Sequence, residues 1–161
     1  FEKNETINKV YGNSLIQSHK ILEKKLSENE KNYVLFASHD GYEKRYGYLH
    51  KRTIRFLKKE SKICGTDELK RTKNVFKPIY YFIRFHIYPG IKIVKMKREN
   101  SVLVKQPNGE GWIIKSVENN LNIEKNIFFG RKNIVNNECV CISGSTKESE
   151  ISVNWEIEKV E

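Results

Sequence analysis

The residues best suited to chemistry lie between Ser38 and Arg52, where the sequence reads SHDGYEKRYGYLHKR. This stretch holds two histidines, two arginines, an aspartate and three tyrosines. Imidazole and phenol groups transfer protons, and a guanidinium group binds a carboxylate through paired hydrogen bonds. The stretch therefore predicts a polar surface that meets an anionic ligand, with His39, Tyr42, His50 and Arg52 as candidate substrate-facing residues.

Each of these candidates also has a purely structural interpretation. His39 and Tyr42 suit a turn in which Asp40 bonds to its own backbone and Tyr42 packs. His50 and Arg52 alternate onto one face of a strand, and that face can be a solvated outer one.

Arg84 and His86 are two further candidate substrate-facing residues, on the less apolar face of a strand. The structural alternative for His86 is a buried ring bonded to a carbonyl group. A zinc site would have to combine His39, Asp40, His50 and His86. Their spacing matches no compact zinc motif, so we predict no metal site and no cofactor in this chain, and no catalytic residue is assigned.

The elements that must position these groups are strands. Short apolar runs with a two-residue period follow one another, and turn signals recur about every ten residues. The clearest run, 79–88, places one set of alternate residues on a core face: Ile79, Tyr81, Ile83, Phe85 and Ile87. We predict an all-β fold, an antiparallel two-layer β-sandwich of about ten strands, forming a single domain over residues 1–161.

The pattern is weakest in residues 1–32, where 20–31 fits either a short amphipathic helix or, as we favour, a strand and a charged hairpin loop. Polar residues predict loops at 66–68 and 70–74, and the latter is strongly basic. The other predicted strands are 33–37, 46–57, 91–97, 102–106, 112–115, 121–129, 134–143 and 151–158. In the last of these, Ile151, Val153, Trp155 and Ile157 point inward.

The three cysteines give no disulfide framework and no zinc motif, so we expect them to be small apolar fillers. Trp112 and Trp155 lie in alternating strand patterns, which favours core packing over sugar stacking.

The chain is strongly basic, since 30 lysines and arginines against 20 acidic residues give a net charge of +10 at pH 7. Such an excess attracts polyanions, although the base composition of the source genome can account for part of it. The sequence lacks helix-turn-helix, zinc-finger and RNP-like patterns, so we expect no nucleic-acid partner. No apolar run approaches the ~20 residues that span a bilayer, so we expect no membrane span. The basic run 70–73 is either a solvated loop or a polyanion contact.

An ordered set of motifs from about residue 33 to the end resembles the C-terminal region of heparinase II/III-like proteins. The set comprises ASHDGY at 37–42, Gly47 with HKR at 50–52, RFHIYPG at 84–90, QPNGEGW at 106–112 and FFG at 128–130. No single piece is specific, but their order and spacing match those of the family.

The resemblance implies the C-terminal β-sandwich of a polysaccharide lyase, whose N-terminal α/α-toroid is missing here. Such enzymes cleave uronic-acid-containing polysaccharides, such as glycosaminoglycans, by β-elimination. The uronate carboxylate is neutralised, a Tyr or His base removes the C5 proton, and an acid protonates the leaving oxygen. The implied partners are an acidic polysaccharide and the protein's own toroid. The implied location is the cell envelope or periplasm of a bacterium.

The sequence departs from the full family pattern in two ways. It lacks the toroid's Asn, His and Tyr, so we expect this fragment to be inactive alone. It also lacks the early β-region motifs that supply zinc ligands in relatives, so zinc in the full-length protein would be held by residues upstream of Phe1. The absence of an initiator Met agrees with a fragment. The alternative functions are a non-catalytic carbohydrate- or polyanion-binding β-sandwich module and, on charge alone, a nucleic-acid-associated domain.

Overall fold

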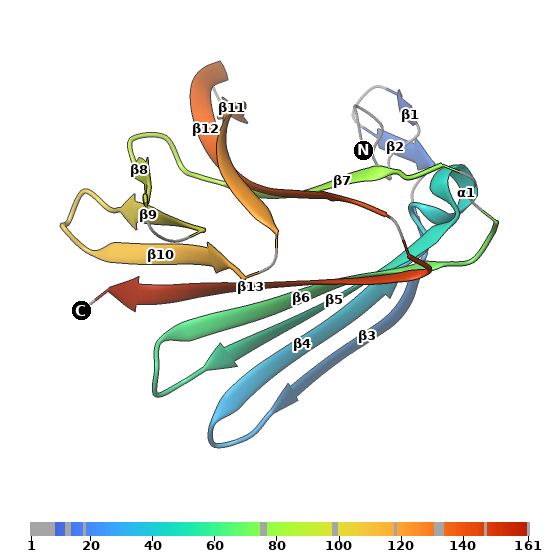
Figure 1. The fold of residues 1–161 in the computed structure, drawn as a ribbon, viewed down its shortest axis with the longest axis horizontal. Coiled ribbons are helices and arrows are strands. Elements are labelled where there is room, and N and C mark those ends of the chain that lie inside the picture. The colour runs from blue at the N-terminus through green and yellow to red at the C-terminus, as the bar shows by residue number, and fades with distance from the viewer. Residues whose placement is uncertain are drawn as a thin grey trace.

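The computed structural model describes residues 9–11, 14–17, 19–74, 77–97, 100–117, 119–130, 134–146 and 148–160. Eleven strands form two antiparallel sheets that pack as a sandwich (Figure 1). The predicted all-β sandwich is therefore confirmed. A separate hairpin of β1 (Lys9–Tyr11) and β2 (Ser14–Gln17) lies near one end of the sandwich.

The larger sheet has eight strands, with four consecutive ones followed by the C-terminal strand. Its order is β3 (Ile21–Glu28), β4 (Asn32–His39), β5 (Tyr48–Leu57), β6 (Lys62–Arg71), β13 (Glu150–Val160), β10 (Gly111–Ser116), β9 (Ser101–Lys105) and β8 (Lys92–Lys95). The smaller sheet runs β11 (Asn120–Phe129), β12 (Ile134–Ser145) and β7 (Tyr80–His86). The core lies between the two sheets.

The alternation predicted for the C-terminal strand is confirmed. Val153 and Trp155 of β13 are buried, and Ile151 and Ile157 pack against the same core. From the other sheet, the odd-numbered residues of β7 face inward, including buried Tyr81. The strand preferred for residues 20–31 is also confirmed, because β3 and β4 form a hairpin there.

The predicted loop at Thr66-Asp67-Glu68 is wrong, as is the start of the basic loop at Lys70. Both lie in β6, which pairs with β5 on one side and β13 on the other. The strand predicted from Tyr46 begins at Tyr48 instead. A single helical turn, α1 (Glu43–Tyr46), precedes it and ends at Gly47, whose φ of 74° suits glycine.

The cysteines behave as small apolar fillers. Cys139 and Cys141 are buried on β12, and all three cysteines are free thiols. Burial raises the pKa of the Cys141 thiol to about 12, so this group stays protonated and unreactive near neutral pH.

The most exposed part of the larger sheet is its edge strand β3. Every residue of this strand is exposed, and Leu26 has 73% of its surface in solvent. Among the described residues, β3 pairs only with β4, so its outer side presents unpaired backbone groups.

Gly65 makes room for the largest core side chain. It lies opposite Trp155 on the neighbouring strand, and a Cβ added at Gly65 would approach the indole ring to 2.0 Å. No rotamer of a small side chain avoids such an overlap, so the indole can lie over the backbone only at a glycine.

We expect Gly65→Ala to lower the free energy of unfolding by about 1–3 kcal/mol, because the methyl group overpacks the core against Trp155. Gly111→Ala is the matched control, since a Cβ there would meet its nearest atoms at an ordinary 3.4 Å. Urea denaturation of both variants tests this, and equal stabilities for the two would contradict it.

Candidate functional site

The centre of the polar cluster is the Asp67 carboxylate on β6, which is only 3% exposed. Its Oδ1 accepts hydrogen bonds from His50 Nε2 and Arg52 Nε, each at 2.7 Å. Its Oδ2 accepts from Trp155 Nε1 at 2.8 Å. Three adjacent strands, β5, β6 and β13, thus converge on one buried anion.

The hydrogen bonds determine the ionisation of this carboxyl group. Burial alone would raise the pKa of Asp67, but the hydrogen bonds from His50, Arg52 and Trp155 and the charge of Arg52 outweigh burial and lower it. Asp67 is therefore a buried carboxylate with a counter-charge in Arg52, whose side chain is 41% exposed.

A chain of hydrogen bonds continues from Asp67 to the turn after β4. His50 Nδ1 lies 2.9 Å from His39 Nε2, and the Gly41 N–H donates to His39 Nδ1 at 3.1 Å. Because that donor leaves His39 Nδ1 unprotonated, the ring proton is on Nε2 and is donated to His50 Nδ1. The His50 proton is then on Nε2, pointing at Asp67. Both rings are neutral in this arrangement.

The surroundings of His39 oppose its protonation. Burial, together with the neighbouring His50 and His19, lowers the pKa of His39 to about 4. The His19 ring lies 4.8 Å from the His39 ring, between centroids, and its Nδ1 is buried without a hydrogen-bond partner among the described residues. A proton on His39 Nδ1 would also oppose the Gly41 N–H.

The structure brings four of the six predicted site residues together. The Tyr42 ring lies 5.3 Å from the His39 ring and 6.0 Å from the His50 ring, and Arg52 joins them through Asp67.

The solvated outer face considered for His50 is wrong, because this side chain is 15% exposed and points between the sheets. The turn proposed at residues 39–42 is present, but Asp40 Oδ1 accepts from the distant Lys20 N–H at 2.7 Å.

Arg84 and His86 lie apart from this cluster, on the exposed face of β7. Arg84 forms an ion pair with Glu124 at 3.3 Å and stacks over the Phe82 ring. His86 Nδ1 lies 2.7 Å from Asn126 Nδ2, so the buried ring bonded to a carbonyl is wrong for His86.

The cavity beside Asp67 is too small for a sugar. It has a volume of about 60 Å³ and lies between His50, Arg52 and the side chains of β7. Pockets that hold small-molecule ligands usually measure about 300–1,000 Å³. With both His39 nitrogens bonded and this cavity small, the cluster acts as a fixed clasp between the sheet and the turn at residues 40–42.

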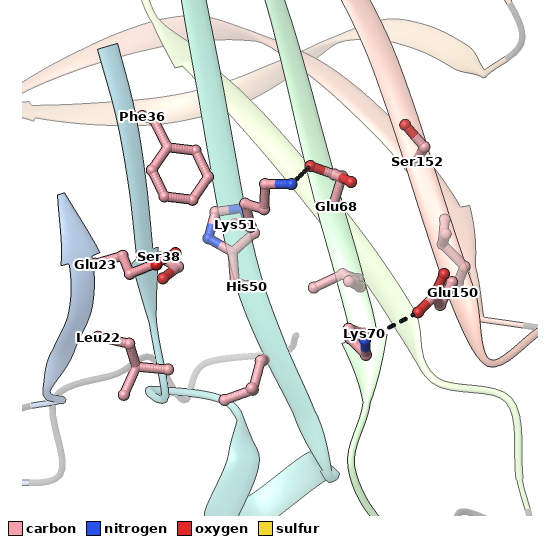
Figure 2. A pocket seen from close by; sticks show the side chains of 13 residues that line it. Leu22, Glu23, Phe36, Ser38, His50, Lys51, Glu68, Lys70, Glu150 and Ser152 are labelled. Atoms are coloured by element: carbon pink, nitrogen blue, oxygen red, sulfur yellow. Dashed lines mark ion pairs between the residues drawn. The ribbon is translucent and has the colours of Figure 1, made fainter. Parts of the chain in front are cut away.

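A groove of ligand size lies on the opposite face of the same sheet (Figure 2). It measures about 640 Å³ and crosses β3, β4, β5, β6 and β13. Two ion pairs line it, Lys51–Glu68 at 2.8 Å and Lys70–Glu150 at 3.4 Å. Glu23 adds a third carboxylate, so the groove has no positive excess that would attract a polyanion.

The described part of the chain has neither a metal-binding cluster nor a membrane-spanning helix. No group of three His, Cys, Asp or Glu side chains in the described ranges is arranged to hold a metal ion. No helix in that part of the chain has the length and apolar character needed to cross a membrane.

Sequence reasoning missed the residue on which the cluster depends. The polar run Thr-Asp-Glu at 66–68 predicts a loop, although Ile63, Asp67 and Leu69 keep the two-residue period of a strand. The role of Trp155 as a donor and the contact of His19 with His39 have no local sequence signal. Both depend on strand order.

Comparisons with known proteins find a matching family model and solved structures of the same architecture. A family model described as heparinase II/III-like, C-terminal, matches residues 2–156. A heparan sulfate lyase mutant from Pedobacter heparinus matches with a TM-score of 0.72 at 14% identity, over 92% of this chain and 23% of that one. A heparinase III gene product matches with a TM-score of 0.69 at 10% identity, over 89% of this chain and 22% of that one. At these identities the likeness shows the fold, and this chain spans less than a quarter of either structure. A search of curated proteins finds no match.

We expect Asp67→Asn to lower the free energy of unfolding by about 3–5 kcal/mol, because it removes the counter-charge of Arg52 and places an amide NH₂ among N–H donors. Glu68→Gln is the neighbouring control. It breaks only an exposed ion pair with Lys51, so its effect stays below about 1 kcal/mol. Chemical denaturation at neutral pH compares the two, and a stable Asp67→Asn protein would refute the central role of this carboxylate.

The pKa of His39 predicts a stability change at acid pH. The unfolded chain takes up a proton near pH 6.5, whereas the folded protein does so only near pH 4. Stability from this group is therefore complete above pH 6.5 and falls between pH 6.5 and 4. We expect His39→Gln to reduce this slope and the exposed His86→Gln to retain it, as measured by urea midpoints across that range. A slope unaffected by His39→Gln would disprove the assignment.

Proposed function

Since this chain belongs to the heparinase II/III-like family as its C-terminal domain, we propose that it is the β-sandwich of a polysaccharide lyase. The proposed substrate is a uronic-acid-containing acidic polysaccharide, cleaved by β-elimination. The observation that carries the proposal is the family match over residues 2–156, and the superposition on lyase structures supports it.

β-Elimination requires a neutralised uronate carboxylate, a base at C5 and an acid at the leaving oxygen. Within this chain the His39 and His50 nitrogens are already bonded along the path to Asp67, and Arg52 is bound to the same carboxylate. We therefore assign the proton transfers to the toroid that precedes this domain in the full-length protein. The sandwich supports that domain. Of the candidate residues, the exposed Arg84 and His86 and the half-exposed Arg52 are the proposed contacts with substrate. His39, Tyr42 and His50 position the turn beside Arg52.

The setting of this activity is also part of the proposal. The toroid of the same polypeptide is the partner domain, zinc is held by residues upstream of Phe1 if the full-length protein uses it, and the enzyme works in the cell envelope or periplasm. The length of the matched lyases, of which this chain covers 22–23%, supports a larger protein.

A second candidate function is a carbohydrate-binding module that holds an acidic glycan without cleaving it. The engagement of the His39 and His50 nitrogens favours this alternative, because it leaves neither ring a free nitrogen for acid–base work.

The test is to express the full reading frame that contains this chain and to incubate it with a panel of uronate polymers. We expect ultraviolet absorbance from an unsaturated uronate product with the full-length protein, and none with the 161 residues alone. New reducing ends without that absorbance would indicate hydrolysis and contradict the lyase. Glycan binding without cleavage of any polymer would favour the binding module.

A further inference from the structure

A second ligand-sized hollow lies at the α1 end of the sandwich, away from Asp67. It measures about 480 Å³ and is formed by α1, the segment after β6 and the segment before β7. Its lining contains four cationic side chains and no carboxylate. The full lining is Lys44, Arg45, Tyr46, Gly47, Lys73, Asn74, Lys77 and Ile79. We call this feature the basic hollow.

The charges of the basic hollow are uncompensated within the described part of the chain. All four cationic side chains are exposed, and none of them forms an ion pair there. Lys73 Nζ lies 3.5 Å from the Glu43 carbonyl oxygen, and the Arg45 guanidinium lies over the Tyr46 ring. The nearest acidic residue along α1, Glu43, does not line the hollow.

Four lysines on the outer face of the larger sheet show the contrast. Lys51, Lys62, Lys70 and Lys115 each form an ion pair with a glutamate. The groove on that face contains glutamates beside its lysines, whereas the basic hollow contains cations alone. The basic hollow thus gathers four cations with no acidic side chain in its lining.

The backbone around the basic hollow is held in place. Thr72 N and Oγ1 both donate to the Gly47 carbonyl, at 2.8 and 3.3 Å, which ties the end of α1 to the segment after β6. The turn before α1 is fixed by the Gly41 bond to His39 and the Lys20 bond to Asp40. The clasp at Asp67 thus indirectly fixes the helix that carries Lys44 and Arg45.

We propose that the basic hollow binds the anionic groups, sulfate or carboxylate, of an acidic glycan. The substrate class rests on the proposed function. The volume suits a sugar-sized ligand, and Tyr46 and Ile79 provide an aromatic and apolar wall beside the cations. A duplex would need cations spread along several phosphates, whereas here four are gathered at one corner, which favours a glycan over nucleic acid.

The test uses the full-length protein and two polymers that uronate elimination cannot cleave, dextran sulfate and carboxymethyl dextran, with duplex DNA as a third ligand. The test variant combines Lys44→Gln, Arg45→Gln, Lys73→Gln and Lys77→Gln. The control variant loses the same charge at four exposed lysines without an ion pair among the described residues: Lys59→Gln, Lys92→Gln, Lys105→Gln and Lys125→Gln. Thermal unfolding of both variants checks that they fold as the parent does.

We expect the dissociation constant for one or both dextrans to rise about tenfold in the test variant at fixed salt, and less than about threefold in the control variant. The dextran that responds identifies sulfate or carboxylate as the bound group. Equal losses in the two variants, or no dextran binding by the parent, would overturn the proposal. A larger loss for DNA than for either dextran would assign the hollow to nucleic acid instead. Neither dextran is a lyase substrate, so this result and the lyase assay can fail independently.

Discussion

The buried carboxylate of Asp67 is the constraint around which one end of this sandwich is organised. A charge that is 3% exposed must be neutralised and fully hydrogen-bonded, and the chain does both with side chains from the two strands that flank β6. Its partners in sequence are 15 to 88 residues away, so the bonds form only when β5, β6 and β13 are in register. The cluster therefore specifies strand order in a way that apolar packing alone does not.

His39 and His50 connect the buried Asp67 carboxylate to the surface turn at Gly41 through hydrogen bonds. Each imidazole has one donor and one acceptor nitrogen, so a single backbone N–H at Gly41 determines the proton positions along the whole path to Asp67. Fixing these protons also fixes the turn that leads into α1. A buried ionic interaction in the core thus supports a cationic surface outside it.

Local pattern predicted most of the architecture and only part of the site. The alternation of β13 and β7 follows directly from residue types, because half of each strand is buried against the other sheet. The same reasoning fails for β6, because its inward positions include Gly65, which lies under Trp155, and the buried Asp67, where apolar residues would be expected. The sequence could predict that four site residues lie together because they are close in the chain: His39, Tyr42, His50 and Arg52. Finding Asp67 and Trp155 required knowing which strands are neighbours.

The exposed edge strand β3 has a consequence for the isolated domain. Within the described part of the chain, the outer N–H and C=O groups of β3 have no partner strand. Together with Ile21 and Leu26 in solvent, they can template the addition of a strand from another molecule. Glu23, Lys24 and Lys25 interrupt this strand with charge, which discourages stacking of copies edge to edge. Aggregation of the isolated domain at high protein concentration will therefore depend on ionic strength, because salt screens the charge repulsion between the β3 edges of neighbouring molecules.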